Sequence, residues 1–218
     1  GFRFNRRLNT CDKLMFANVE TKNYLLPVLP DNTEIITEVG INRNDIVERQ
    51  CNDLKKDVTF LVAGRLIYRK GILFLLDVLK TLPLDSKYKV KIVGQGPEFQ
   101  KIKEQCKKYR LEEHVDLMGS VTFAEMKEIY ESADVLVMPS LRETTGTVLV
   151  EALCYGLPVI TIDGFGGKVV LDESVAWFYS GNTKEEILLS LKTILLECMH
   201  NSELIMKKSR AAQRMAKQ

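Results

Sequence analysis

The sequence has few of the residues that build transition-metal sites and none of the pairings that such sites use. Only two histidines occur, His114 and His200, and the five cysteines lie far apart with no CxxC pair. A zinc site needs clustered Cys and His ligands, and a histidine-based triad needs a histidine beside a nucleophile. We therefore predict neither. The odd, scattered cysteines also argue against a disulfide scaffold and favour a reducing compartment.

The chain also lacks an excess of one charge and a long apolar run. It holds 31 Lys and Arg against 29 Asp and Glu, and this net charge of +2 is too small to indicate nucleic acid as a partner. No apolar run approaches the ~18 residues of a membrane span, and the opening GFRFNRRLNT lacks the apolar core of a signal peptide. We predict a cytoplasmic protein.

From residue 57 onward, short apolar runs alternate with amphipathic stretches. The near-continuous apolar runs indicate strands covered on both faces, and their alternation with helical patterns indicates parallel βαβ units. We predict an α/β fold with a Rossmann-like, doubly wound parallel sheet of about six strands and helices on both faces. The expected strands are 58–64, 88–94, 114–119, 134–140, 157–162 and 176–180.

Residues 1–45 fit this alternation less well. A strand is expected within 13–18 and a short helix within 19–29, followed by an extended linker. The segment is either a first βα unit of the same domain or the tail of a preceding one. Because the chain has no initial Met and no clear first element, we expect it to be a piece of a longer protein.

In an open parallel sheet, ligands bind beyond the carboxyl ends of the strands, so the loops there are candidate sites. In GRLIYRKG, Gly64 allows a turn, Arg65 follows the strand and Lys70 precedes the start of a helix. Cations at a helix N-terminus can hold a phosphate or diphosphate, Arg as a bidentate fork and Lys as a point charge. The alternative is that these basic side chains are simply solvated.

A second loop, ETTGTVLVEALCYG, places Glu143 and Glu151 on either side of Gly146. Gly146 is expected to open a helix that runs to Tyr155, which leaves Glu143 in the loop and Glu151 just over one turn inside the helix. Free N–H groups at Gly146 and Thr147 attract an anion. Two carboxylates beside that anion can bind the hydroxyls of the same ligand. A sugar nucleotide has both kinds of group, so the combination indicates such a ligand. Otherwise the two glutamates simply face water.

These loops, taken in order with GQGPE, ADVLVMPS and GLPVI, resemble the carboxy-terminal, donor-binding domain of retaining glycosyltransferases of the GT-B fold, family four, also described as glycosyl transferases group 1. The resemblance covers residues 34–200, and the E-x7-E pattern before GLPVI is its most specific part. It implies that Arg65 and Lys70 neutralise the donor diphosphate in place of a metal. Glu143 would lie against the transferred sugar, and Glu151 would hold the ribose hydroxyls.

The resemblance implies further donor contacts. The loop 118–121 would line the base, the backbone near Gly146 would meet the phosphates, and a Gly-rich loop after residue 162 would approach the donor. Thr144 and Thr145 stand where the family carries small or aromatic residues, which bears on sugar selectivity. The implied donor-binding residues are Gly64, Met118, Val121, Thr145, Gly146, Thr147, Glu151, Gly166 and Gly167.

The implied reaction transfers a hexose from a UDP-, GDP- or ADP-sugar to a hydroxyl of an unknown sugar, lipid-linked or polysaccharide acceptor, with retention and without a metal. Residues 1–45 would be the tail of an amino-terminal acceptor domain plus a linker, 46–200 the nucleotide-sugar-binding domain, and 201–218 a helix packing toward the missing domain. The piece alone would be inactive.

Alternatives are a sugar-nucleotide epimerase or sugar phosphorylase of the same fold, a non-catalytic nucleotide-binding module, or a membrane-surface adaptor. The basic run 101–110 would allow peripheral contact with the inner face of a membrane.

Overall fold

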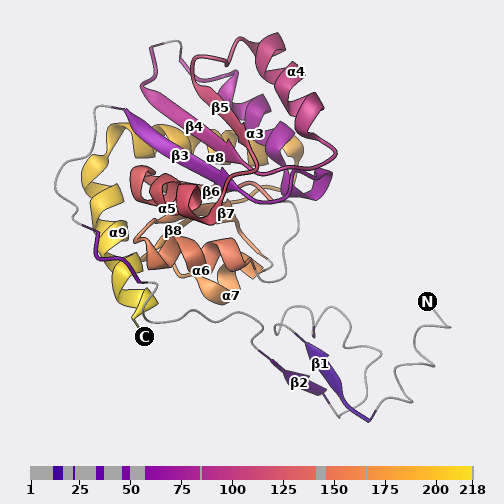
Figure 1. The fold of residues 1–218 in the computed structure, drawn as a ribbon, viewed down its shortest axis with the longest axis vertical. Coiled ribbons are helices and arrows are strands. Elements are labelled where there is room, and N and C mark those ends of the chain that lie inside the picture. The colour runs from indigo at the N-terminus through magenta and orange to yellow at the C-terminus, as the bar shows by residue number, and fades with distance from the viewer. Residues whose placement is uncertain are drawn as a thin grey trace.

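The computed structural model describes residues 12–16, 22, 33–36, 46–49, 57–83, 85–140, 146–164 and 166–217. Its main body is a six-stranded sheet with helices on both faces (Figure 1), which confirms the predicted α/β fold. Each strand of this sheet lies within the range expected from the sequence. The strands are β3 (Val58–Ala63), β4 (Tyr88–Val93), β5 (Val115–Gly119), β6 (Val135–Met138), β7 (Val159–Ile162) and β8 (Ala176–Tyr179).

The strand order creates a switch point between β3 and β6. All pairs are parallel, in the order β5-β4-β3-β6-β7-β8. The chain therefore builds outward from β3 to one edge, returns to the centre at β6, and builds outward to the other edge. Connections leave β3 and β6 in opposite directions, so a crevice forms beyond their carboxyl ends.

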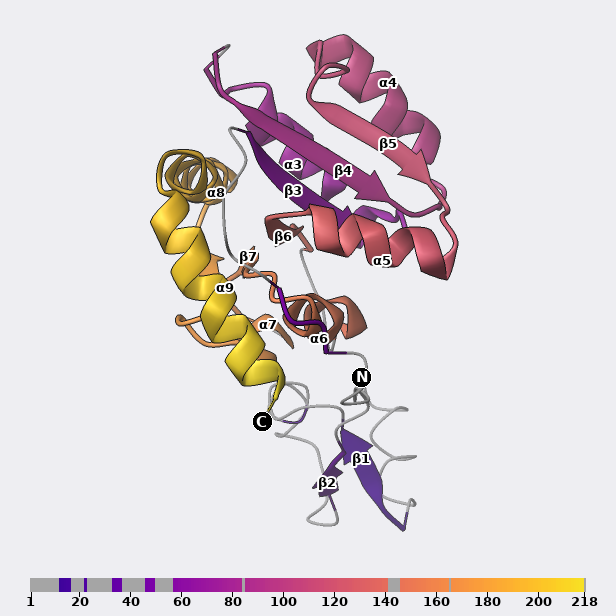
Figure 2. The same ribbon diagram turned by 60° about the vertical axis from the view of Figure 1, so that its left-hand side comes forward.

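Helices cover the two faces of the sheet in separate groups (Figures 1 and 2). Phe60 of β3 belongs to one apolar core and the adjacent Leu61 to the other, and neither side chain is exposed to solvent. This burial on both faces is why β3 shows no alternation of polar and apolar residues. The core of Phe60 includes residues of α3 (Ile72–Leu79), α4 (Phe99–Tyr109) and α8 (Lys184–His200), and that of Leu61 includes residues of α5 (Phe123–Ser132), α6 (Thr147–Cys154) and α9 (Ser202–Ala216).

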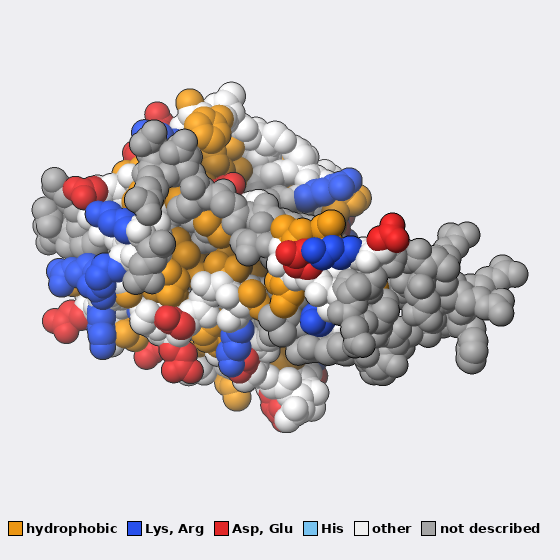
Figure 3. Space-filling view, turned by 90° about the horizontal axis from the view of Figure 1, so that it is seen from below, with side chains coloured by type: hydrophobic (Ala, Val, Ile, Leu, Met, Phe, Trp, Pro, Cys, Tyr) orange, Lys and Arg blue, Asp and Glu red, His pale blue; other side chains and the backbone are white. Residues whose placement is uncertain are grey.

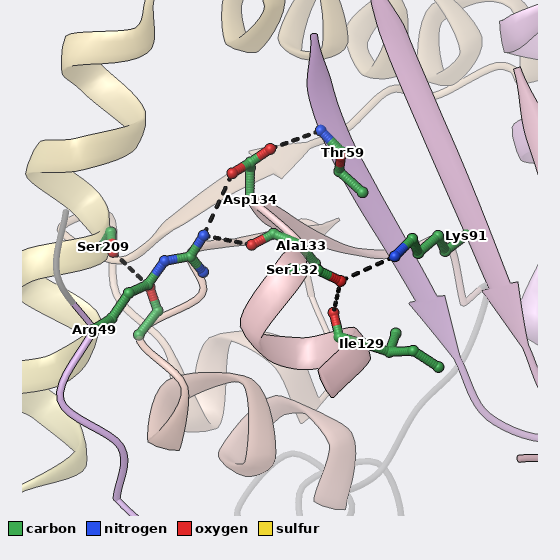
Figure 4. A network of polar contacts seen from close by, with 9 residues as sticks. Arg49, Thr59, Lys91, Ile129, Ser132, Ala133, Asp134 and Ser209 are labelled. Carbon is green, nitrogen blue, oxygen red and sulfur yellow. Dashed lines mark hydrogen bonds and ion pairs between the residues drawn. The ribbon is translucent and has the colours of Figure 1, made fainter. Parts of the chain in front are cut away.

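A polar network ties the segment 46–49 to the amino ends of the central strands (Figure 4). The Arg49 guanidinium donates to the carbonyl of Ala133 at 2.5 Å and pairs with the Asp134 carboxylate at 3.3 Å. The other oxygen of Asp134 accepts from the backbone N–H of Thr59 at 2.8 Å. Asp134 precedes β6 and Thr59 lies near the start of β3, so these bonds join the two central strands at the end opposite the crevice.

Two segments differ from the sequence-based expectations. The expected Gly-rich loop after β7 contains a short helix, α7 (Gly166–Val170). The expected linker contains a strand, β2 (Thr33–Ile35), which pairs in parallel with β1 (Leu14–Phe16), and in both ribbon views this pair lies apart from the large sheet. The expected helix within 19–29 falls largely outside the described residues. Whether residues 1–45 are the tail of a preceding domain stays a prediction.

Helix α9 packs onto the same body as the sheet, although the predicted domain ended at residue 200. One side of α9 contacts α6, and Ile205, Ala211 and Ala212 on it are buried. The Ser209 hydroxyl donates to the carbonyl of Gly156 at 2.7 Å, and Gln213 donates to the carbonyl of Arg49 at 3.0 Å. The predicted contact of this helix with a missing domain stays a prediction.

Candidate functional site

A cleft of about 480 Å³ opens at the carboxyl ends of the strands, between β3, β4, α5 and the start of α6. A small cavity of about 10 Å³ adjoins it where β3 and β6 end, and the two share Gly64. The sequence predicted a site at this edge because open α/β sheets bind ligands at the switch point. Of the predicted residues, Gly64, Val121, Thr147 and Glu151 line the cleft.

The floor of the cleft is formed by two loops whose backbones touch. The N–H of Gly64 donates to the carbonyl of Val93 at 3.0 Å, and the N–H of Gly94 donates to the carbonyl of Gly119 at 2.7 Å. Gly94 has φ +138°, and a Cβ placed on it would lie 1.9 Å from the carbonyl oxygen of Gly64. Only glycine fits there, so GQGPE serves this close approach of backbones.

The two predicted cations meet at the small cavity. Arg65 is exposed directly after β3, and Lys70 is half-buried at the end of a short 3-10 helix, η3 (Tyr68–Lys70). Both line the cavity together with Ser140, which follows β6. Ser140 is 1% exposed, and its hydroxyl has no hydrogen-bond partner among the residues that the structure describes. The cations and this hydroxyl therefore supply hydrogen-bond donors at the switch point.

The start of α6 faces the cleft. Gly146 is the N-cap and is buried, none of the described side chains caps the helix, and Thr147 is its first residue, as predicted. The first N–H groups of a helix have no partner within the helix and carry partial positive charge. Because Thr147 and Val148 both line the cleft, this charge is directed toward it. An anion is therefore favoured at the end of the cleft nearest α6.

Glu151 lies one turn further along α6, and its carboxylate is held by a residue that sequence reasoning missed. The Tyr130 hydroxyl, on α5, donates to Glu151 Oε2 at 2.7 Å. The Tyr130 ring is 3% exposed and stacks on Tyr155 with ring centroids 4.8 Å apart. Burial raises the pKa of Tyr130 well above its usual range, and the hydrogen bond to Glu151 is the second cause of this increase. No local pattern marks such a residue, because the contact joins two different helices.

Other predicted residues lie elsewhere or outside the described part of the chain. Met118 belongs to β5 itself, so only residues after Gly119 form a loop, and its exposed side chain does not line the cleft. Gly166 and Gly167 are buried in α7, and Gly167 faces the side chain of Thr161. The predictions for Glu143 and Thr145 concern residues that the structure does not describe. Donor contacts by these five predicted residues stay predictions.

Further features of the described residues bear on partners. No helix there has the length and apolar character needed to cross a membrane. No group of three or more His, Cys, Asp or Glu side chains gathers there as metal ligands. On the face shown in Figure 3, Lys and Arg side chains are interspersed with Asp and Glu. This mixture matches the low net charge of the sequence.

The arrangement can bind a ligand with an anionic centre and neighbouring hydroxyls. Arg65 and Lys70 line the small cavity, and the start of α6 and Glu151 line the adjoining cleft. A carboxylate close to a diphosphate would repel it unless hydroxyl donors stand between them. A nucleoside diphosphate has this order of groups, with ribose hydroxyls beyond the phosphates.

Comparison with known proteins supports a sugar-transferring family. The chain is 29% identical over 176 residues to an amylovoran biosynthesis glycosyltransferase of Erwinia amylovora, an alignment that covers 78% of this chain and 49% of that protein. It is 34% identical over 125 residues to the gpi3 subunit of phosphatidylinositol N-acetylglucosaminyltransferase of Schizosaccharomyces pombe, covering 57% of this chain and 27% of that protein. The chain thus spans half or less of the length of these curated relatives.

A solved structure shares the fold. The structure of HepE (Alr3699) of Anabaena in complex with UDP superposes with a TM-score of 0.79 at 18% identity, over 97% of this chain and 60% of that one. The family model described as "Glycosyl transferases group 1" matches residues 45–213, more than half of the chain. The chain therefore belongs to the family glycosyl transferases group 1.

Proposed function

We propose that this chain is the donor-binding half of a glycosyltransferase that moves a hexose from a nucleotide diphosphate sugar to an acceptor hydroxyl. The observation that supports the proposal is that the linings of the cleft and of the small cavity share Ala63 and Gly64. Gly64 belongs to both, so the cations of one and the carboxylate of the other can act on a single ligand.

Arg65 and Lys70 bind the diphosphate and stabilise it as the leaving group, together with the N–H groups at the start of α6. Negative charge builds on the diphosphate as the bond to the sugar breaks. Each hydrogen-bond donor held in position toward such charge typically stabilises the transition state by about 3–4 kcal/mol. Two cations in this position take the role of a metal ion, so the proposed reaction is independent of metal.

Glu151 accepts hydrogen bonds from the ribose, and Glu143 lies against the transferred sugar. Val121 and the adjoining backbone line the part of the cleft that receives the base. Glu143 orients the sugar and does not attack it, because this site assists the departure of the diphosphate. Retention of configuration then results from attack by the acceptor oxygen on the face that the diphosphate leaves, and the departing diphosphate oxygen takes the proton of the acceptor hydroxyl. UDP is the first candidate donor nucleotide, since the HepE structure contains it.

The acceptor site belongs to the part of the enzyme that precedes this chain. This assignment agrees with the length of the relatives, of which the chain spans half or less. The name of one relative concerns amylovoran biosynthesis and that of the other concerns phosphatidylinositol, so a polysaccharide or lipid-linked acceptor is the proposed class. The proposed location is the cytoplasm, at the inner face of a membrane if the acceptor is lipid-linked.

Calorimetric titration of the chain with UDP, GDP and ADP tests the proposal. Arg65→Ala removes a cation that lines the small cavity, and Arg69→Ala removes an exposed neighbour that lines neither space. A hydrogen bond to a charged group contributes about 1.5–3 kcal/mol, so Arg65→Ala should weaken binding by about 10- to 100-fold and Arg69→Ala by far less. Absence of binding by all three nucleotides at millimolar concentration contradicts the proposal.

A further inference from the structure

Tyr130 is a buried residue of the cleft lining that also packs against the neighbouring helix α6. Its hydroxyl reaches Glu151 Oε2 at 2.7 Å from α5, while Glu151 belongs to α6. The Tyr130 side chain also lines the cleft and is only 3% exposed. The sheet brings α5 and α6 side by side, so the carboxylate is held from outside its own helix.

The Tyr130 ring has little freedom to move. It lies nearly parallel to the ring of Tyr155, with an angle of 9° between the planes, and Tyr155 is the C-cap of α6. Tyr130 also belongs to the apolar core that contains Leu149 and Leu153 of α6. A ring fixed by packing on these neighbours presents its hydroxyl at a fixed point, so the bonded carboxylate oxygen is fixed as well.

We propose that Tyr130 is a positioning residue that holds the Glu151 carboxylate in the orientation that accepts both hydroxyls of a ribose. This inference rests on the proposed function, since it assigns Glu151 to the ribose. It adds that the selectivity of the site for ribose depends on a tyrosine that bonds to the glutamate and makes no required contact with the ligand.

The hydrogen-bonding capacity of the carboxylate agrees with this role. A carboxylate has two oxygens and about four sites for hydrogen bonds. Tyr130 occupies one site on Oε2, which leaves both oxygens able to accept from a pair of adjacent hydroxyls. A glutamate side chain without such a hydrogen bond loses rotamer freedom when a ligand binds, and this loss costs binding free energy. The bond to Tyr130 has already removed that freedom from Glu151, so ligand binding avoids this cost.

The ionisation of Tyr130 supports the direction of the bond. Burial and the adjacent Glu151 raise the pKa of Tyr130, so the phenol keeps its proton at every pH at which the protein is handled. The hydroxyl therefore remains the donor and the carboxylate remains the acceptor. The Tyr130 hydroxyl and the ribose hydroxyls are therefore all donors to one carboxylate, which has enough acceptor sites for them.

The test compares Tyr130→Phe with the unchanged chain in calorimetric titrations with three probes: UDP, 2′-deoxy-UDP and inorganic pyrophosphate. The substitution keeps the ring and removes only the hydroxyl. Tyr88→Phe is the matched control, because Tyr88 is also 3% exposed and lies on β4 away from the lining of the cleft. Thermal melts establish that both variants are folded.

The unchanged chain should prefer UDP over 2′-deoxy-UDP by about tenfold or more, the value of one hydrogen bond to a charged group. Tyr130→Phe should reduce this preference severalfold and leave pyrophosphate affinity unchanged, while Tyr88→Phe should alter neither. The inference is overturned if Tyr130→Phe keeps the full preference, or if it weakens all three probes equally, as a general loss of structure would. Failure of UDP to bind the unchanged chain would instead refute the proposed function itself.

Discussion

Gly94→Ala is predicted to destabilise the protein by pushing apart the two loops that form the floor of the cleft. A Cβ at residue 94 would lie 1.9 Å from the carbonyl oxygen of Gly64, and backbone atoms cannot rotate away as the end of a side chain can. The loops would have to separate by more than an ångström. Overpacking of this kind typically costs about 1–3 kcal/mol, in addition to the strain of a positive φ.

Gly164→Ala isolates the contribution of that contact. Gly164 has φ +132°, close to the +138° of Gly94, and a Cβ there would meet no heavy atom of the described residues within 4 Å. Both variants therefore carry similar backbone strain, and only Gly94→Ala adds the collision. We expect Gly94→Ala to be less stable than Gly164→Ala by about 1–3 kcal/mol, within the ~5–15 kcal/mol stability of a typical domain.

Urea denaturation with equal m-values measures this difference, and thermal melts check it at about 2–4 °C per kcal/mol for a chain of this size. Because Arg65 follows Gly64, the displaced loop should also weaken UDP binding in Gly94→Ala and not in Gly164→Ala. Equal stability of the two variants would refute the close contact between the loops and the explanation of why glycine occupies residue 94.

Two further substitutions test features away from the cleft. Asp134→Ala leaves Arg49 without its carboxylate and the Thr59 N–H without an acceptor, so urea denaturation should show a loss of about 3 kcal/mol, and a loss under 1 kcal/mol would contradict the network. The backbone N–H and then the hydroxyl of Thr122 lower the pKa of Glu125 below its usual 4.5, so its carboxylate adds stability above pH 4.5 that is lost as the pH falls through the lower folded value. The difference in free energy of unfolding between the unchanged chain and Glu125→Gln should therefore shrink below pH 4.5. A difference that grew there would contradict the lowered pKa of Glu125.

The central sheet was predictable because its signal is local. Strands such as β3, with Phe60 and Leu61 buried on opposite faces, must be mostly apolar, and that run is visible in the sequence. The position of the site follows from the same topology, since Gly64 and Glu151 both fall in segments that follow strands. These residues needed no knowledge of which helices are neighbours.

The remaining features depend on contacts between distant segments. Tyr130 is an ordinary apolar-face residue of a helix until α5 is placed beside α6, and only then does its hydroxyl meet Glu151. The expected Gly-rich loop contains α7, and Gly167 in it lies so close to Thr161 that an added Cβ would come within 2.9 Å of that side chain, a contact that composition cannot indicate. Arg49 likewise precedes the first strand of the large sheet with no sequence signal for a partner, although it binds Asp134 across the fold.

Mapping of amide chemical shifts during a UDP titration tests most directly the claim that the carboxyl ends of the strands bind the nucleotide diphosphate. The largest shifts should come from Gly64, Gly94 and Thr147, which line the cleft. The amides of Thr59 and Asp134, at the amino ends of the central strands, should remain unchanged. Shifts confined to those two residues, or absent from the cleft at saturating UDP, would contradict the account.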